Sequence, residues 1–467
     1  MTERALEEAA ARAVEYLQGL PERPVAARIG AAELRTRLGG PLPDGPSDPA
    51  EVVAQLAKLA DDGVVASAGP RYFGFVVGGS LPAALGADWL AATWDQNAGL
   101  FALSPAAAAV EDACAGWLVD LLGLPATVTT GFVTGALMAN FTGLAAARHQ
   151  VLAAAGWDVE RDGLAGAPPV RLVVGAERHV TVDIALRYLG FGGGHLRVVP
   201  ADGQGRMRPD ALQDTLAAGG GPAIVCAQAG NVNTGAFDPL GPICDAAKGH
   251  GAWVHVDGAF GLWAAASPAL RHLVEGLERA DSWAADAHKW LNVPYDSGLA
   301  FVAHPDAHRA AFSKVASYFI TGQEQERDPD AFTPEASRRA RGFPVWAALR
   351  SLGRSGTAAL VERCCAHARH FADALGQAAG VEVLNEVVLN QVLVRFLDPG
   401  GDHDARTREV IRRVQADGTL WLGGTTWHDM AAMRISVSGW ATTEEDVDRS
   451  VEAILRAAAA AGSGARA

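Results

Sequence analysis

Lysine is scarce in this sequence. Only four of the 467 residues are lysine, at positions 58, 248, 289 and 314, so the basic surface is made almost entirely with arginine. Lys289 stands in an apolar, aromatic context, between His288 and Trp290. A buried ammonium is costly unless it is paired or neutralised, and neutralised lysines are good nucleophiles for carbonyl carbons. Lys289 is therefore the first candidate for a functional side chain.

Cysteine and positive charge are also in short supply. The five cysteines form no CxxC pair and are odd in number, which excludes a disulfide framework and a cysteine-based zinc site and leads us to expect a reducing cytoplasm. The formal net charge is −14. Nucleic acids and anionic membrane surfaces both require a basic patch, so neither is an expected partner.

Long apolar runs are missing as well. No stretch of about 18 uncharged apolar residues occurs, so no membrane span is expected. The first residues are charged and amphipathic, unlike a secretory signal. The length exceeds what one core supports. We expect an N-terminal arm (1–69), a large α/β domain (70–341) and a small α+β domain (342–467).

The segment before residue 131 is mainly helical by pattern. Its expected helices, with starts or stops marked by proline or a capping residue, cover residues 1–19, 48–61, 82–93 and 104–122. Residues 20–48 are rich in proline and glycine and are predicted to be extended. Such an arm either lies on a partner subunit or packs on its own domain, and the sequence favours neither.

From Gly131 onward, short apolar runs alternate with helical segments. The expected strands are Arg171–Val174, Leu196–Val199, Ala223–Ala227, Trp253–Asp257, Ser282–Ala284 and Leu299–Ala303. The expected helices are 131–155 after a turn, Val180–Leu189, Pro209–Ala218, Leu240–Gly249 and Pro268–Ala280. This alternation predicts a mostly parallel sheet covered on both faces, with ligands bound beyond the carboxyl ends of its strands.

The remaining third is predicted to begin with a loop over 304–341. A helix, Gly342–Leu375, follows it. The expected elements of the small domain are strands Glu382–Leu384, Gln391–Phe396, Thr419–Leu422 and Met433–Val437 and helices Ala405–Gln415 and Thr443–Ala461.

Four features at the predicted strand ends carry chemistry together. Thr134, Gly135 and Ala136 form a small-residue turn at a helix start, which suits an anion. Asp257 ends a strand, and His179 follows one. Alone, each feature also has a purely structural explanation. The turn can be one that binds nothing, Asp257 and His179 can be helix caps, and Lys289 can lie along apolar surface with its ammonium in water. Combined with Lys289 they match the needs of pyridoxal 5'-phosphate (PLP): an amine for its aldehyde, a carboxylate for its ring nitrogen, a flat ring to stack, and a phosphate cradle.

The motifs DAHKWLNVPYDSG and HVDGAFG, with PRYFGFVVGGSLPAALGADWL and MRISVSGWATTEEDVD, resemble the group II PLP-dependent amino-acid decarboxylases, including the aromatic-amino-acid and glutamate enzymes. The resemblance covers roughly residues 41–458. It implies a fold-type-I homodimer with its active site at the subunit interface. It also implies a Schiff base on Lys289, a ring-nitrogen contact from Asp257, His179 and Ala259 on opposite ring faces, and phosphate contacts from His288 and the Thr134–Ala136 turn.

Some positions depart from the family pattern. Leu137 and Val232 stand where hydroxyl residues are usual near the cofactor, and Val77 replaces a threonine near the substrate carboxylate. Asp286 stands where an asparagine often binds phosphate, and its charge should repel that group. No tyrosine lies between Phe319 and Arg341, where the family loop carries one; Tyr318 precedes the loop and Phe332 lies inside it.

The missing tyrosine leaves two reactions open. Decarboxylation to the amine is the main expectation, and oxygen-dependent decarboxylation with deamination to an aldehyde is the alternative. A scaffold without catalysis is a third hypothesis, which the intact Lys289, Asp257 and His179 disfavour. The substrate pocket is expected to include Val77, Asp95, Asn97 and Phe101; its polarity suits a polar or basic side chain, and its aromatic residues suit an aromatic one. Arg434 is a candidate for either substrate binding or structure.

Overall fold

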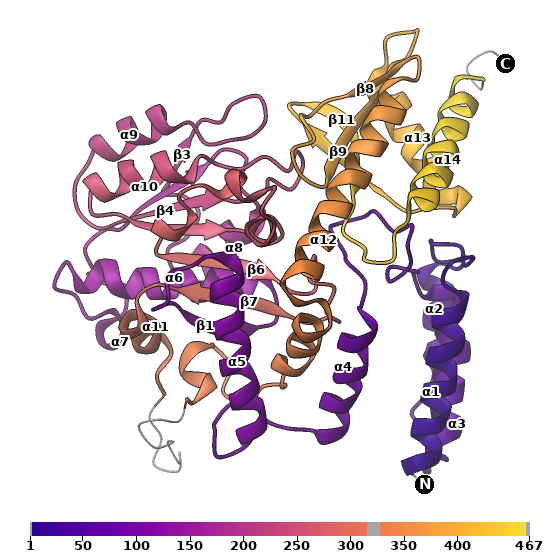
Figure 1. The fold of residues 1–467 in the computed structure, drawn as a ribbon, viewed down its shortest axis with the longest axis horizontal. Coiled ribbons are helices and arrows are strands. Elements are labelled where there is room, and N and C mark those ends of the chain that lie inside the picture. Colours follow the sequence, from indigo (N-terminus) through magenta and orange to yellow (C-terminus); the bar gives the residue numbers. More distant parts are fainter. Residues whose placement is uncertain (1, 315–326, 464–467) are drawn as a thin grey trace. The chain divides into compact units, whose positions relative to one another are not determined.

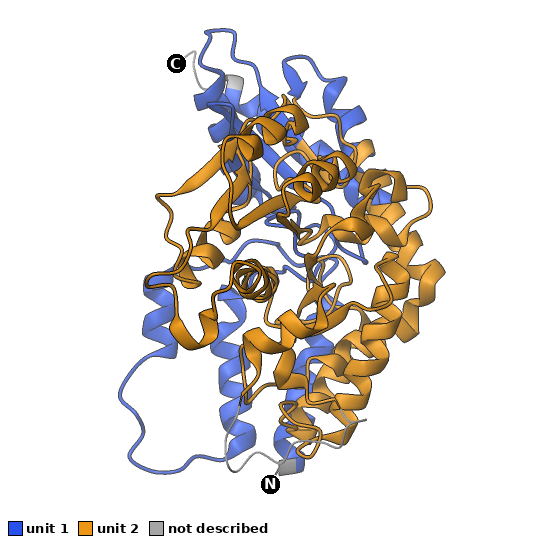
Figure 2. Ribbon diagram, turned by 90° about the vertical axis from the view of Figure 1, so that its left-hand side faces the viewer, with its two compact units in different colours: residues 1–77, 370–383, 393–467 blue, residues 78–369, 384–392 orange. Residues whose placement is uncertain are grey.

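The computed structural model describes residues 2–314 and 327–463. The chain forms two compact units (Figure 2): residues 78–369 with 384–392 make the larger one, and residues 1–77, 370–383 and 393–467 make the smaller one. The division expected from sequence, with boundaries near residues 70 and 342, stays a proposal about which parts fold as domains.

A seven-stranded sheet organises the larger unit, in the order β1-β7-β6-β5-β4-β2-β3. Its strands are β1 (Thr129–Val133), β2 (Arg171–Gly175), β3 (Leu196–Val199), β4 (Ala223–Gln228), β5 (Trp253–Asp257), β6 (Ser282–Asp286) and β7 (Gly298–Val302). β3, β2, β4, β5 and β6 pair in parallel, while β7 runs antiparallel to both β6 and β1. The predicted mostly parallel α/β sheet is confirmed.

Helices cover both faces of this sheet (Figure 1). The most central is α6 (Ala136–Ala153), which packs across β5, β6 and β7 and against α8 (Val180–Tyr188). The other helices of this unit are α4 (Pro82–Trp94), α5 (Pro105–Leu122), α7 (Val159–Asp162), α9 (Pro209–Ala217), α10 (Leu240–Gly249) and α11 (Pro305–Phe312). The long α12 (Gly342–Gly376) is interrupted at Gly353, whose φ is +61°.

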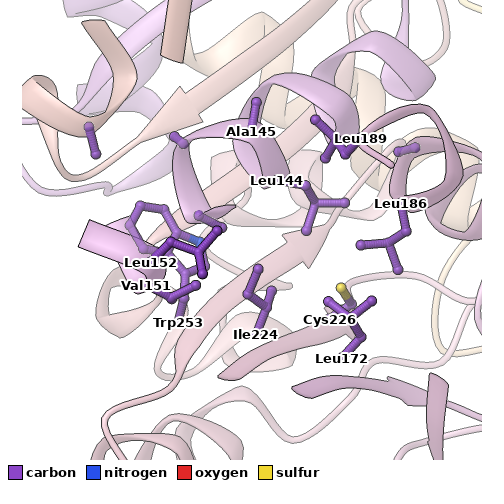
Figure 3. Close-up of a cluster of buried hydrophobic side chains, with 14 of the residues drawn as sticks. Leu144, Ala145, Val151, Leu152, Leu172, Leu186, Leu189, Ile224, Cys226 and Trp253 are labelled. Atoms are coloured by element: carbon purple, nitrogen blue, oxygen red, sulfur yellow. The ribbon is translucent and has the colours of Figure 1, made fainter. Parts of the chain in front are cut away.

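A large core cluster lies between α6, α8 and the strands beneath them (Figure 3). Leu144 and Leu152 of α6, Leu186 of α8 and Ile224 of β4 are completely buried in it. Strands that are buried on both faces read as continuous apolar runs, as residues 172–174 of β2 and 223–227 of β4 do here. This packing holds α6 against the sheet and so positions the turn at its start.

The smaller unit contains a four-stranded sheet in the order β10-β11-β9-β8. Its strands are β8 (Val381–Val383), β9 (Gln391–Phe396), β10 (Gly423–Trp427) and β11 (Met430–Ser436), and its helices are α1 (Thr2–Gly19), α2 (Ala31–Leu38), α3 (Pro49–Ala60), α13 (His403–Asp417) and α14 (Glu444–Ser463). α13 packs on β11 and α14.

Two predictions failed because backbone contacts override local pattern. The expected helix over Pro268–Ala280 is a pair of short 3-10 turns, since Gly276 has a φ of +85° and its backbone approaches Gly241 too closely for a side chain. The expected strand Thr419–Leu422 is also wrong. Trp421 instead bridges to Tyr72, with which it stacks, and β10 begins afterwards at Gly423.

Further elements were not predicted, among them α2, α11 and β1. α2 interrupts the segment expected to be extended, and its sequence AAELRTRL consists largely of good helix formers. α11 occupies part of the expected 304–341 loop, because Pro305 starts it and Phe312 is buried beneath it. β1 lies where the sequence predicts a turn, because Thr129–Val133 is short and contains Gly131.

All five cysteines are free and buried. Within residues 2–314 and 327–463, no helix is long and apolar enough to cross a membrane.

The β2–β3 pair offers a matched test of burial. Val174 and Val198 are partners in the parallel register, but Val174 is 0% exposed and Val198 is 51% exposed. We expect Val174→Ala to lower the free energy of unfolding by roughly 2 kcal/mol, because it leaves a cavity in the core. Val198→Ala should change it by less than about 1 kcal/mol. Urea unfolding at fixed protein concentration measures both, and equal losses would contradict the assigned core.

Candidate active site

The candidate site lies at the edge of the large sheet where the parallel strands end. β5 ends at Asp257 and β6 at Asp286, while the antiparallel β7 begins at Gly298 on the same edge. β1 ends there too, at Val133, just before the turn into α6. The topology therefore brings together side chains far apart in the sequence, at the position where open α/β sheets bind ligands.

Lys289 follows β6 and is paired with a buried carboxylate. Its Nζ lies 2.9 Å from Oδ2 of Asp286, and the two side chains are 20% and 3% exposed. The sequence predicted that this lysine would be paired or neutralised, and the partner is Asp286. The ammonium is thus held near the strand ends while keeping some access to solvent.

His288 contacts the same carboxylate from its other side. The backbone N–H of Ser297 donates to its Nδ1 at 3.2 Å, so a neutral ring carries its proton on Nε2. That Nε2 lies 3.4 Å from Oδ1 of Asp286. Burial lowers the pKa of His288, which keeps the ring neutral. Tyr295 stacks on the ring with centroids 4.2 Å apart.

The start of α6 is tightly packed and lined by glycine. Gly135 caps the helix without a side-chain hydrogen bond, and a Cβ on Gly135 would lie only 3.1 Å from Cε1 of His288. Gly298 is equally constrained, since its Cβ would lie 2.5 Å from Cα of Gly135. The backbone N–H of Ala136 donates to Oδ1 of Asp286 at 2.6 Å. A carboxylate thus already contacts the positive end of this helix.

Asp257 is buried and held in place by two donors. Its Oδ1 accepts a hydrogen bond from the N–H of Ala259 at 3.2 Å, and its Oδ2 accepts one from Nδ2 of Asn140 at 3.2 Å. Only 4% of the residue is exposed. The carboxylate is therefore oriented by α6 as well as by its own strand end.

His179 caps α8, as the structural interpretation of its position anticipated. The N–H of Thr181 donates to its Nδ1 at 3.3 Å, and the hydroxyl of Thr181 lies 2.8 Å from the same nitrogen. Both of these contacts are to Nδ1, so they orient the ring and do not use Nε2. The ring-stacking role of His179 stays a prediction.

The other predicted positions are more scattered. Asp95 is exposed at the left-handed end of α4, and Oδ1 of Asn97 accepts from the N–H groups of Gly99 and Arg338. The N–H of Phe101 donates to Asp328. Their substrate roles stay predictions.

Val77 and Arg434 belong to the smaller unit, so neither is part of the site as described. Leu137 packs against the core cluster, and Val232 follows the buried Asn231. Tyr318 and the loop residues up to 326 lie outside the described residues. Phe332 is buried, with His308 5.2 Å and Arg327 4.6 Å from its ring.

Four residues of the site region were missed by sequence reasoning: Asn140, Thr181, His255 and Ser282. A signal for two of them was present. Trp253, His255 and Asp257 alternate along one strand and so share a face, and a histidine inside a buried strand requires polar partners. Asn140 lies one turn after Ala136, on the same face of α6.

Comparison with known proteins gives a consistent result. Residues 33–397 match the family model described as the pyridoxal-dependent decarboxylase conserved domain. An aromatic-L-amino-acid decarboxylase of Bacillus atrophaeus is 27% identical over 445 residues, covering 92% of this chain and 90% of that relative.

Two solved structures share the fold. The crystal structure of Oryza sativa TDC with PLP and tryptamine has a TM-score of 0.92 at 23% identity, covering 99% of this chain and 98% of that one. The crystal structure of Rhodiola rosea 4-hydroxyphenylacetaldehyde synthase has a TM-score of 0.88 at 22% identity, covering 98% of both chains.

The site geometry fits PLP. A glycine-lined helix N-terminus suits a phosphate, Asp257 offers an oriented carboxylate, and Lys289 offers an amine at the same sheet edge. Only Asp286 opposes the fit, because its negative charge contacts the N–H that a phosphate would use.

Replacing that charge should favour the cofactor. We expect Asp286→Asn to bind PLP roughly tenfold more tightly, because a like charge beside the phosphate is removed. Titration of the cofactor-free protein, followed by absorbance, measures the affinity. Asp296→Asn is the control, since Asp296 pairs with Arg341 and is exposed. Weaker binding by Asp286→Asn would instead mean that the ion pair with Lys289 is needed to hold the amine.

Buried His255 should make the fold sensitive to acid. Burial lowers its pKa from 6.5 to about 4, so the unfolded chain takes up this proton first as the pH falls. The resulting stability is fully present above pH 6.5, and about 3 kcal/mol of it is lost by pH 4. His255→Gln should show a shallower loss of unfolding free energy over this range, whereas exposed His195→Gln should follow the parent. Identical pH profiles for all three would refute the buried neutral ring.

Proposed function

Because the chain belongs to the pyridoxal-dependent decarboxylase family and is a PLP-dependent amino-acid decarboxylase, we propose that it converts an L-amino acid to the corresponding amine and CO2. The observation that carries the proposal is the pairing of Lys289 with Asp286 beside the N-terminus of α6. This arrangement supplies an amine beside a glycine-lined helix N-terminus, a kind of site that suits a phosphate.

We assign the roles as follows. Nζ of Lys289 binds the cofactor aldehyde, and the phosphate contacts the Thr134–Ala136 turn and His288. Asp257 holds a proton on the pyridine nitrogen, because an oriented, buried carboxylate favours the protonated form of a partner base. When bound, PLP supplies a ring that accepts the electron pair left by the departing carboxylate.

His179 and Ala259 complete the proposed cofactor site on opposite ring faces. A neutral imidazole can stack on a flat ring, and alanine leaves room for that ring on the other side. The proton that Cα requires after CO2 leaves would come from His179 or from a residue near the loop. The chain would exclude water from this step, which favours loss of a charged carboxylate as neutral CO2.

The substrate is proposed only by class. The Bacillus relative acts on aromatic amino acids by its name, and Phe101 is the aromatic residue among the proposed pocket residues. The exposed carboxylate of Asp95 suits a substrate with a polar or basic side chain. Both classes therefore belong in any substrate test.

A second candidate is oxygen-dependent conversion of the amino acid to an aldehyde. The sequence from Phe319 to Arg341 has no tyrosine to protonate Cα, and a fold relative carries the name of an aldehyde synthase. Phe332, the aromatic residue of this segment, is enclosed by His308 and Arg327. A slower proton delivery would leave more time for O2 to react.

A homodimer with a shared active site and a cytoplasmic location are further parts of the proposal. They are supported by the resemblance to the decarboxylases and by the five buried free thiols.

A panel of aromatic, basic and acidic L-amino acids tests the reaction. We expect amine and CO2 by mass spectrometry without O2 uptake in an oxygen electrode. Lys289→Ala should abolish turnover and also the absorbance band at roughly 420 nm that marks PLP bound to a lysine. Lys248→Ala, an exposed lysine of the same unit, should retain both.

The other outcomes are distinct. Aldehyde with stoichiometric peroxide would establish the second candidate. Activity that survives Lys289→Ala would overturn the assignment of the lysine, and a protein that never shows the band with added PLP would be a scaffold.

A further inference from the structure

A buried chain of hydrogen bonds runs from Trp253 to the residues assigned to the cofactor ring. We propose that Asn140 is a positioning residue that, through this chain, holds Asp257 as a hydrogen-bond acceptor and fixes His179 as the tautomer with its proton on Nε2. The catalytic meaning of this inference rests on the proposed function, because it assigns Asp257 and His179 to the cofactor. The hydrogen-bond geometry of the network does not depend on the proposed function.

The first donor determines which group donates and which accepts in each later hydrogen bond of this network. Nε1–H of Trp253 can only donate, and it lies 2.9 Å from Oγ of Ser282. The Ser282 hydroxyl therefore has its own proton to give to Nδ1 of His255, 2.8 Å away. With Nδ1 accepting, neutral His255 carries its proton on Nε2. That nitrogen lies 2.9 Å from Oδ1 of Asn140 and donates to it.

Asn140 accepts one hydrogen bond of the network and donates the next ones. Since its Oδ1 accepts, its Nδ2 group donates to Oδ2 of Asp257 at 3.2 Å and to Oγ1 of Thr181 at 3.3 Å. A carboxylate can only accept, so the far end of the chain imposes the same orientation. A flipped amide would set oxygen against the carboxylate of Asp257 and N–H against N–H of His255.

The branch through Thr181 reaches His179. The Thr181 hydroxyl accepts from Asn140 and so donates to Nδ1 of His179, 2.8 Å away. The backbone N–H of Thr181 donates to the same nitrogen at 3.3 Å. Two donors on Nδ1 leave Nε2 as the nitrogen that bears the proton. His179 is thereby held with its Nε2–H as a defined hydrogen-bond donor.

Burial makes this arrangement hard to change. Asn140, His255 and Ser282 are 0% exposed, so a broken bond leaves an unsatisfied polar group in the interior. α6 passes so close that a Cβ on Gly143 would lie 2.8 Å from Nδ1 of His255. This close packing restricts the ring of His255, and burial also lowers its pKa to about 4.

The test reads the tautomers directly. Nitrogen-15 NMR of the cofactor-free protein, labelled at histidine, distinguishes protonated from unprotonated ring nitrogens, and the signals are assigned by loss in His179→Gln and His255→Gln. We expect both histidines to show unprotonated Nδ1 and protonated Nε2 at pH 7. Protonated Nδ1 on either ring in the unmodified protein would overturn the proposal.

The matched variants are Asn140→Leu and Thr142→Val. Both residues are completely buried in α6, but the Thr142 hydroxyl bonds only to Met138 of its own helix. Asn140→Leu removes the acceptor for His255 and the donor to Asp257. We expect it to shift His255 to a mixture of tautomers and to weaken PLP binding to the cofactor-free protein by about tenfold or more. Thr142→Val should leave both measurements unchanged.

These outcomes separate the inference from the proposed function. Unchanged tautomers and affinity in Asn140→Leu would overturn the positioning role even in an active decarboxylase. If the protein yields aldehyde but shows the expected NMR pattern, the hydrogen-bond network is supported and only the proposed reaction changes. If Asn140→Leu does not fold, the tautomers of the unmodified protein still decide.

Discussion

The close approach of α6 to the central strands constrains everything else at the site. Two glycines allow it: Gly143 faces His255, and Gly298 faces Gly135, each with no space for a Cβ. At this distance the helix brings its N-terminal N–H groups to the sheet edge and its Asn140 to the end of β5. Apolar packing of Leu144 and its neighbours provides the energy that holds the helix there.

Charge at the sheet edge is organised around one carboxylate. Asp286 contacts Lys289, His288 and the first N–H of α6, so a single residue pairs a cation, a neutral ring and a helix dipole. Trp263 fixes the backbone of Asp286 by donating to its carbonyl oxygen at 2.9 Å. A cofactor phosphate entering this site would compete with that carboxylate for the same N–H, so the resident ion pair and the cofactor are coupled by electrostatics.

Predictions succeeded where residues close in sequence determine an element, and they failed where residues distant in sequence determine it. Strands β3, β5 and β9 and helix α10 were predicted with their observed bounds, because apolar runs and turn residues near each segment determine them. The helix expected over Pro268–Ala280 failed because Gly276 must pass close to Gly241, which is distant in sequence. The strand expected at Thr419–Leu422 failed because Trp421 pairs with Tyr72 instead.

The sequence by itself determined the family, the sheet class and the chemical types at the site, since the motifs around Lys289 and Asp257 are local strings of residues. Only the tertiary structure decided which groups touch. That Asp286 is the partner of Lys289, and that Asn140 joins Asp257 to His255, depends on strand order and on the depth at which α6 packs. Hydrogen bonds act over about 3 Å, so their partners follow from the packed fold and not from spacing along the chain.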